Sequence, residues 1–85
     1  MNIENLKTRY EYDLKYKLRE KTAAQFHYHQ MQELYKEIWD VHKVFCYELE
    51  FEQGIRVTGY DCNKVELAVL ELESILTEKG HTCLH

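Results

Sequence analysis

The residues of this chain best suited to chemistry are its histidines and cysteines. His42 and Cys46 lie four residues apart, a spacing that places both side chains on one face of a helix and suits two ligands of a metal ion. His81 and Cys83 alternate near the end of the chain. Together these four residues could complete a metal site, although the chain contains no Cys-x-x-Cys or His-Glu-x-x-His motif.

The same residues also have a simpler interpretation. His42 then lies at the edge of an apolar helical stripe, Cys46 is a small core residue, and the histidines of the tail are solvated. We adopt this interpretation, so we expect no cofactor and keep the metal site as an alternative. Three widely spaced cysteines form no even disulfide framework, and they indicate free thiols in a reducing, cytoplasmic compartment.

A second group of candidate residues is basic and is interleaved with tyrosines. Basic and aromatic side chains together can follow a phosphate backbone and stack bases, which makes nucleic-acid binding an alternative function. Glu11, Asp13 and Glu20 dilute this charge, so the segment also fits an ordinary solvated helix face with ion pairs one turn apart. The six basic residues are Lys7, Arg9, Lys15, Lys17, Arg19 and Lys21.

Acidic residues dominate the second half of the chain. Residues 44–85 carry eight Asp/Glu against three Lys/Arg, whereas residues 1–43 carry seven against eight, and the net charge of −4 disfavours non-specific nucleic-acid binding. Glu48, Glu50 and Glu52 alternate with apolar residues, so they would share the outward face of a strand. That acidic face could meet a basic partner, or it could deter edge-to-edge pairing of the strand.

The sequence does not predict an enzyme. The only serine, Ser74, has no nucleophile motif around it, and no glycine-rich loop could cradle a phosphate. No sequence pattern indicates a pocket in which two glutamates could act together as a general acid and a general base. We therefore expect a non-enzymatic protein.

The spacing of the apolar residues changes along the chain, and this change predicts the helices and strands that position the candidate residues. From Ile3 to Phe45 the apolar residues follow a heptad, which predicts one long N-terminal helix. Such a helix would span about 60 Å, whereas a compact chain of this length is only about 30 Å across, so a second chain should cover the apolar stripe. The alternative is a helix that breaks near Thr22. The predicted oligomer interface consists of Ala24, Met31, Leu34, Ile38, Val41 and Phe45.

The apolar residues then alternate from about residue 45 to 60, which predicts a β-hairpin. A three-residue loop, Glu52–Gly54, would pair Phe51 with Ile55 and Leu49 with Val57. This loop requires a left-handed residue at its third position, and Gly54 occupies that position.

A second helix is predicted from about residue 63 to 79. Asp61 or Asn63 can cap its start, and Gly80 can end it. Leu67 and Leu70 fall opposite its apolar face, so they form either a contact surface or two scattered exposed leucines. The tail after Gly80 is either a short third strand or a frayed end.

These elements predict one domain, residues 1–85, of the α+β class and mostly helical. We expect an inhibitor, adaptor or accessory factor that self-associates through the helical seam and binds a partner protein. The residues assigned to partner binding are Glu48, Glu50, Glu52, Leu67 and Leu70.

Several further expectations follow from the same patterns. His27 would lie in the helical seam, so acidification should weaken self-association. A small-ligand or metal-binding module at an oligomer interface is the main alternative, beside nucleic-acid binding. The chain has no signal-peptide pattern and no apolar run long enough to cross a bilayer, so no membrane partner is expected.

Overall fold

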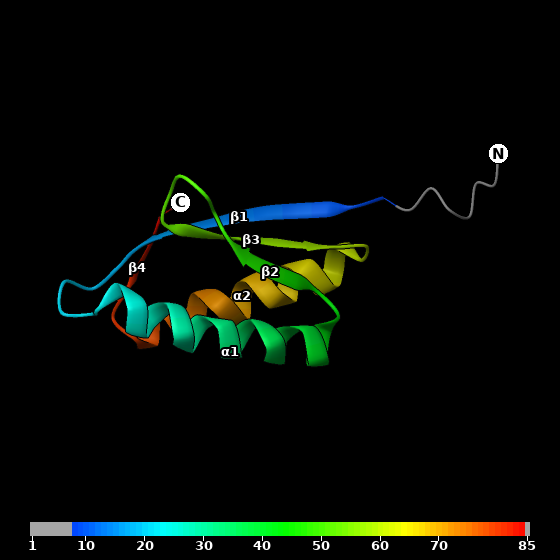
Figure 1. Ribbon diagram of the computed structural model, residues 1–85. Helices are drawn as coiled ribbons and strands as arrows, with labels where there is room; N and C mark the ends of the chain where they lie inside the picture. The colour runs from blue at the N-terminus through cyan, green and yellow to red at the C-terminus, as the bar shows by residue number, and fades with distance from the viewer. Residues whose placement is uncertain (1–7, 85) are drawn as a thin grey trace.

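The chain folds into a four-stranded antiparallel sheet with two helices packed on one of its faces (Figure 1). The computed structural model describes residues 8–84. In chain order the elements are β1 (Tyr10–Lys17), α1 (Ala24–His42), β2 (Phe45–Glu48), β3 (Gly54–Gly59), α2 (Cys62–Glu78) and β4 (Thr82–Leu84). The strand order is β2-β3-β1-β4, which is the split β-α-β, or ferredoxin-like, topology.

The prediction of a long N-terminal helix, and with it of a mostly helical fold, is wrong. Residues 10–17 form β1 at the centre of the sheet, paired with β3 on one side and β4 on the other. Tyr10 and Leu14 are four residues apart, so they fit one face of a helix, but they also fit one face of a strand. The intervening charged residues supply the period of two that a half-buried strand requires.

The first helix therefore begins only at Ala24, close to the position where the alternative prediction placed a break. Ala23 is its N-cap and provides no side-chain hydrogen bond. The helix buries His27, Met31, Tyr35 and Ile38 against the sheet, with the spacing of a single helical face. It ends at Lys43, which adopts a left-handed conformation with φ of 56°.

The β-hairpin exists, but its predicted register is wrong. Glu48 pairs with Ile55 and Tyr47 pairs with Arg56, so the connection is longer than three residues. Gly54 belongs to β3 and has no positive φ. A Cβ at Gly54 would lie 2.7 Å from Leu49 Cδ1 and 2.9 Å from the Leu14 carbonyl oxygen, so the glycine allows close packing of the chain rather than a left-handed turn.

The second helix agrees with its prediction to within one residue at each end. The Asp61 carboxylate accepts hydrogen bonds from the backbone N–H groups of Asn63 and Lys64, which is the expected cap. Gly80 follows the helix with φ of 86°, and the tail then forms the short strand β4. The helix face that packs on the sheet consists of Val65, Ala68, Val69, Leu72 and Leu76.

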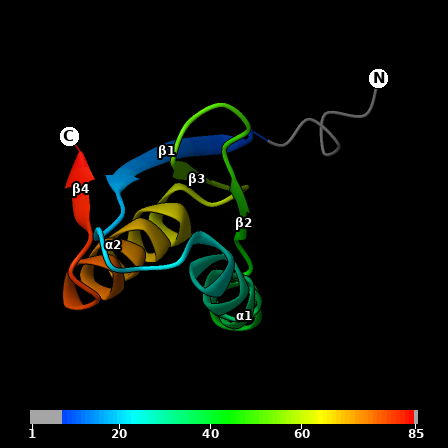
Figure 2. The ribbon, with the colours of Figure 1, turned by 60° about the vertical axis from the view of Figure 1, so that its left-hand side comes forward.

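Both helices cover the same face of the sheet, and the other face is open (Figures 1 and 2). Leu14, Tyr16, Ile55 and Val57 point from the central strands toward the helices and form the middle of the core. Among the described residues, no helix is long and apolar enough to cross a membrane.

Candidate interaction surface

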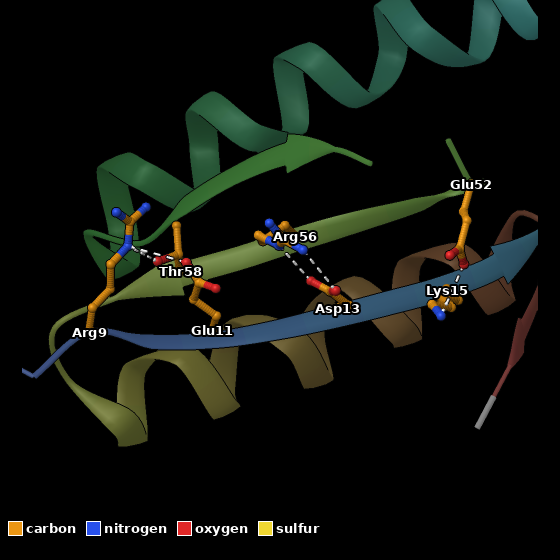
Figure 3. A network of polar contacts seen from close by, with 7 residues as sticks. All are labelled: Arg9, Glu11, Asp13, Lys15, Glu52, Arg56 and Thr58. Carbon is orange, nitrogen blue, oxygen red and sulfur yellow. Dashed lines mark hydrogen bonds and ion pairs between the residues drawn. The ribbon is translucent and has the colours of Figure 1, made fainter. Parts of the chain in front are cut away.

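The open face of the sheet carries a network of charged pairs (Figure 3). Arg56 on β3 donates two hydrogen bonds to Asp13 on β1, at 2.8 and 3.1 Å. Hydrogen bonding to Arg56 keeps the pKa of Asp13 below its ordinary value. Lys15 pairs with Glu52 at 3.0 Å. Arg9 Nε donates to the Thr58 hydroxyl at 2.7 Å and lies 3.6 Å from the Glu11 carboxylate. The charged groups at the centre of this face are therefore paired with one another.

The basic segment proposed for nucleic-acid binding does not form a helix face in this fold. Lys15 and Lys17 lie on β1 instead of a helix face, and Arg9 directly precedes that strand. Arg19 and Lys21 lie in the loop after it, and Lys7 is outside the described residues. RNA-binding sheets of four strands stack bases on aromatic side chains of their central strands. Here the equivalent central positions hold the Asp13–Arg56 ion pair. The geometry gives no support to base stacking on this face.

One half of β1 has an unpaired edge. The backbone N–H of Tyr16 donates to the Gln53 carbonyl oxygen, 3.2 Å away, so the even-numbered residues of β1 direct their backbone groups toward β3. The odd-numbered residues direct theirs to the other side, where β4 pairs only with Lys15–Lys17. Figure 2 shows β4 beside this end of β1 alone. The N–H and C=O groups of Glu11 and Asp13 therefore have no strand partner among residues 8–84.

An apolar groove of about 290 Å³ lies directly beneath this unpaired edge. It is lined by Tyr12, Val65, Glu66, Val69, Leu70 and Glu73, and we call it the β1–α2 groove. The helical residues among them recur at the spacing of one helix face, which α2 turns toward the N-terminal half of β1. Leu70 is 61% exposed, and the two glutamates flank it along the helix. No basic side chain lines the groove.

The residues predicted to bind a partner are distributed over three different places. Leu70 lines the β1–α2 groove, whereas Leu67 is similarly exposed on the same helix but does not line it. Glu48 faces the helices and accepts a hydrogen bond from the Tyr35 hydroxyl at 3.0 Å. Glu52 pairs with Lys15, and Glu50 is exposed in the connection after β2. The expected acidic strip on one outward face does not form, because the hairpin register differs.

The predicted helical seam is used inside the chain. Met31 and Ile38 are fully buried against the sheet, and Leu34 is packed at the edge of the same core. The fully buried side chains of Met31 and Ile38 cannot meet a second chain in this fold. Ala24, Val41 and Phe45 remain exposed.

The four candidate metal ligands are not brought together. His42 Nε2 lies 2.6 Å from the Glu71 carboxylate, while Cys46 is on β2. His81 lies directly before β4 and Cys83 lies within it, at the opposite edge of the sheet. Three strand spacings, about 14 Å, separate the two outer strands. Within residues 8–84, no group of three or more His, Cys, Asp or Glu side chains is placed to hold a metal ion.

A buried polar cluster, which the sequence patterns did not reveal, joins β1, α1 and the residue before β4. The Tyr16 hydroxyl and His27 Nε2 are hydrogen-bonded at 2.6 Å, and the ring centroids of His27 and His81 are 4.8 Å apart. His81 Nδ1 accepts from the backbone N–H of Arg19 at 3.0 Å. Burial lowers the pKa of both histidines, and their mutual proximity lowers that of His27 further. The sequence predicted His27 in an intermolecular seam, but its side chain is buried in the protein's own core.

A second groove, of about 540 Å³, lies between the C-terminal end of α1 and the N-terminal end of α2. Its wall is formed by Trp39 and Phe45, whose rings stack with centroids 4.3 Å apart, and the Lys43 ammonium lies 5.5 Å from the centre of the Trp39 ring. The rings of Trp39 and Phe45 and the ammonium group of Lys43 therefore already interact with one another. Phe45 belongs to β2, an outer strand of the sheet, so this groove also adjoins a strand edge that has no strand partner among residues 8–84. Unlike in the β1–α2 groove, two lysines, Lys43 and Lys64, line it.

Together, the fold and its surface define a class: a small two-layer α+β protein with charged pairs on its open face and an incomplete sheet edge. No family model matches the chain, and neither any curated protein nor any solved structure matches it. Because one fold hosts many functions, the function has to be argued from the surface itself.

Proposed function

We propose that this chain is a small, non-enzymatic protein-interaction module that binds an extended segment of a partner protein at the β1–α2 groove. The observation that carries the proposal is the unpaired edge of β1 at Glu11 and Asp13, directly above the exposed side chains of Tyr12 and Leu70. Strand addition needs these two features together, because backbone hydrogen bonds give affinity and an adjacent pocket gives specificity.

The exposed edge favours a different chain over a second copy of this one. A symmetric pairing of two β1 edges about Tyr12 would set Glu11 of each copy directly opposite Asp13 of the other. Like charges in directly opposed positions destabilise a sheet. Acidic side chains on an edge strand also deter self-pairing. Self-association through this edge is therefore not part of the proposal.

The remaining chemistry of the chain supports an adaptor or inhibitor rather than a catalyst. Burial raises the pKa of the Cys46 thiol to about 12, which leaves it protonated and unreactive at neutral pH. Cys46, Cys62 and Cys83 are all free thiols, which supports the proposal of a reducing, cytoplasmic location. The carboxylates that line the β1–α2 groove are those of Glu66 and Glu73, which lie on separate turns of α2.

Selection of peptides on the purified protein tests this proposal. A library of random peptides is selected for binding, and each selected peptide is titrated into isotope-labelled protein while backbone amide signals are recorded. We expect the largest changes at the amides of Glu11 and Asp13, and we expect Leu70→Ser to weaken binding. Peptides that bind only at other faces, or a failure to select any binder, would contradict the proposal.

A further inference from the structure

We infer that the partner segment of the β1–α2 groove is a short extended strand with one apolar residue and a Lys or Arg two positions away on each side. This inference rests on the proposed function and specifies the chemistry of the partner. It is carried by the direction of the free backbone groups, the apolar floor of the groove and the charge of its rim.

The backbone of β1 sets the position of the added strand. Lys15 and Lys17 use their outward backbone groups to pair with Leu84 and Thr82 of β4. An added strand would continue the line of β4 and pair with the next outward residues, Asp13 and Glu11. Among residues 8–84, the part of this edge without a strand partner is residues 10–14, about the length of an ordinary strand.

The residue of the partner that lies opposite Tyr12 has a defined environment. Directly opposed residues of neighbouring strands point to the same face of a sheet, and Tyr12 points toward the helices. The partner side chain at this position would therefore contact Val69 and Leu70. Contact with this apolar floor removes exposed hydrophobic surface from water, so an apolar side chain is favoured there.

Charge specifies the two flanking positions. Residues two positions from the apolar residue point to the same face and lie about 13 Å from each other along a strand. Glu66 and Glu73 are seven residues apart on α2, so they are separated by about 10 Å along the helix axis. The flexible side chains of Lys or Arg can span this small difference. Neither glutamate has an ion pair among the described residues. Glu66 Oε1 accepts a hydrogen bond from the Cys62 thiol at 3.8 Å, and this weak bond leaves the carboxylate able to pair with a basic group.

The intervening positions of the partner point to the open face and need no charge. They would lie opposite Glu11 and Asp13, whose carboxylates already have Arg9 and Arg56 as partners. A polar, uncharged residue such as threonine suits these positions and favours the extended conformation. The preference for basic residues is thus confined to the side that faces the helices.

Three labelled peptides test the inference. The first contains Lys-Thr-Leu-Thr-Lys, the second replaces both lysines by glutamate, and the third replaces leucine by serine; all carry the same threonine flanks. We expect the first to bind about tenfold more tightly than the second at low salt, as two exposed charge pairs allow, and this advantage should shrink as salt is added. The third should bind more weakly than the first at every salt concentration.

Variants of the protein provide matched controls. The double change Glu66→Gln and Glu73→Gln should remove the preference for lysine over glutamate, whereas Glu78→Gln, on the same helix outside the groove, should keep it. Leu70→Ser should weaken binding of the first peptide, whereas Leu67→Ser, an equally exposed leucine on the same helix, should not. Urea unfolding of each variant checks that it is folded.

The outcomes separate the inference from the function on which it rests. Peptides that shift the Glu11 and Asp13 amides without any preference for lysine would overturn the inference and leave the proposed function intact. Equal effects of Leu70→Ser and Leu67→Ser, or no change at those amides, would overturn both. A concentration-dependent dimer that Leu70→Ser abolishes would show that a second copy occupies the groove, and this too would overturn both.

Discussion

The two halves of β1 belong to one strand and turn alternate side chains toward the same helices, yet they differ sharply in burial. Leu14 and Tyr16 are each 1% exposed, whereas Tyr10 and Tyr12 are 38% and 43% exposed. The residue type does not explain this difference, because three of the four are tyrosines. In the described part of the chain, the C-terminal half has a strand on both sides, while the N-terminal half has a strand on one side only.

This difference separates stability from binding within a single strand. The hydroxyl of Tyr16 lies in the core and is hydrogen-bonded to His27, whereas the Tyr12 hydroxyl has no partner among the described residues. Substitutions in the C-terminal half should therefore destabilise the fold. Equivalent substitutions in the N-terminal half should alter binding at the β1–α2 groove with little effect on stability.

The largest difference is expected between Leu14→Ala and Tyr12→Ala. The first removes a fully buried side chain and leaves a cavity, which costs about 2–5 kcal/mol of unfolding free energy. The second removes a half-exposed ring and should cost less than about 1 kcal/mol. Urea unfolding of the two variants measures both values. Equal losses would show that the two halves contribute equally to the core.

A second contrast uses the two glycines that pair with opposite ends of β1. Gly54 lies opposite Lys15, and an added methyl group would approach the Leu14 carbonyl oxygen to 2.9 Å. Gly59 lies opposite Tyr10, and its nearest neighbour would be the Val65 side chain at 3.3 Å. We expect Gly54→Ala to lower the unfolding free energy by about 1–3 kcal/mol, because backbone cannot move aside easily. Thermal unfolding should show a clearly smaller effect for Gly59→Ala.

A third contrast removes one oxygen atom from each half. Tyr16→Phe deletes the partner of His27 Nε2 and leaves a buried imidazole whose Nδ1 also has no hydrogen-bond partner. The expected cost is about 1–2 kcal/mol. Tyr12→Phe is the matched control and should be nearly neutral. A neutral Tyr16→Phe would mean that the hydrogen bond to His27 contributes nothing to stability.

The smallest effect is a dependence on pH that belongs to the C-terminal half alone. The pKa values of His27 and His81 are lowered in the folded chain, so the unfolded chain binds protons more readily. Their contribution is complete above the ordinary pKa of about 6.5 and is lost as the pH falls through that value toward the lower folded pKa values. We expect a loss of about 1 kcal/mol between pH 7 and pH 6, measured by urea unfolding.

The variant His81→Asn and the carboxyl group of Asp13 test whether this pH dependence comes from the two histidines. His81→Asn keeps an acceptor for the Arg19 backbone N–H but cannot be protonated, so it should flatten the pH dependence. Asp13, in the N-terminal half, has its pKa lowered from 3.8, so its contribution is lost only below that value. A pH dependence between 7 and 6 that survives loss of both histidines would contradict this assignment.

Elements with strong local signals could be predicted from the sequence. Elements whose conformation depends on residues far along the chain could not. The second helix was predictable because Asp61 caps it and Gly80 follows it, and both signals lie within the element or next to it. Residues 10–17 were not, because Tyr10 and Leu14 satisfy a helical and an extended period equally well. Only pairing with β3 and β4, which lie far along the chain, decides between them.

The candidate site was predictable only in part, for a similar reason. Leu70 could be identified because it falls on the polar side of a clear amphipathic helix. The unpaired edge beside it depends on how far β4 extends along β1, and no local pattern encodes that distance. Glu48 faces the helices because it pairs with the buried Ile55, and the predicted hairpin register did not contain this pair.

The strand order β2-β3-β1-β4 also has a consequence for the folding of a newly synthesised chain. β1 is the first element to be synthesised, but Lys15 must wait for Gly54, and Lys17 must wait for Thr82, before either has its strand partner. The hairpin of β2 and β3 needs no such delay. Contacts between distant residues slow folding, so the central strand of the finished sheet should be among the last elements to acquire its native neighbours.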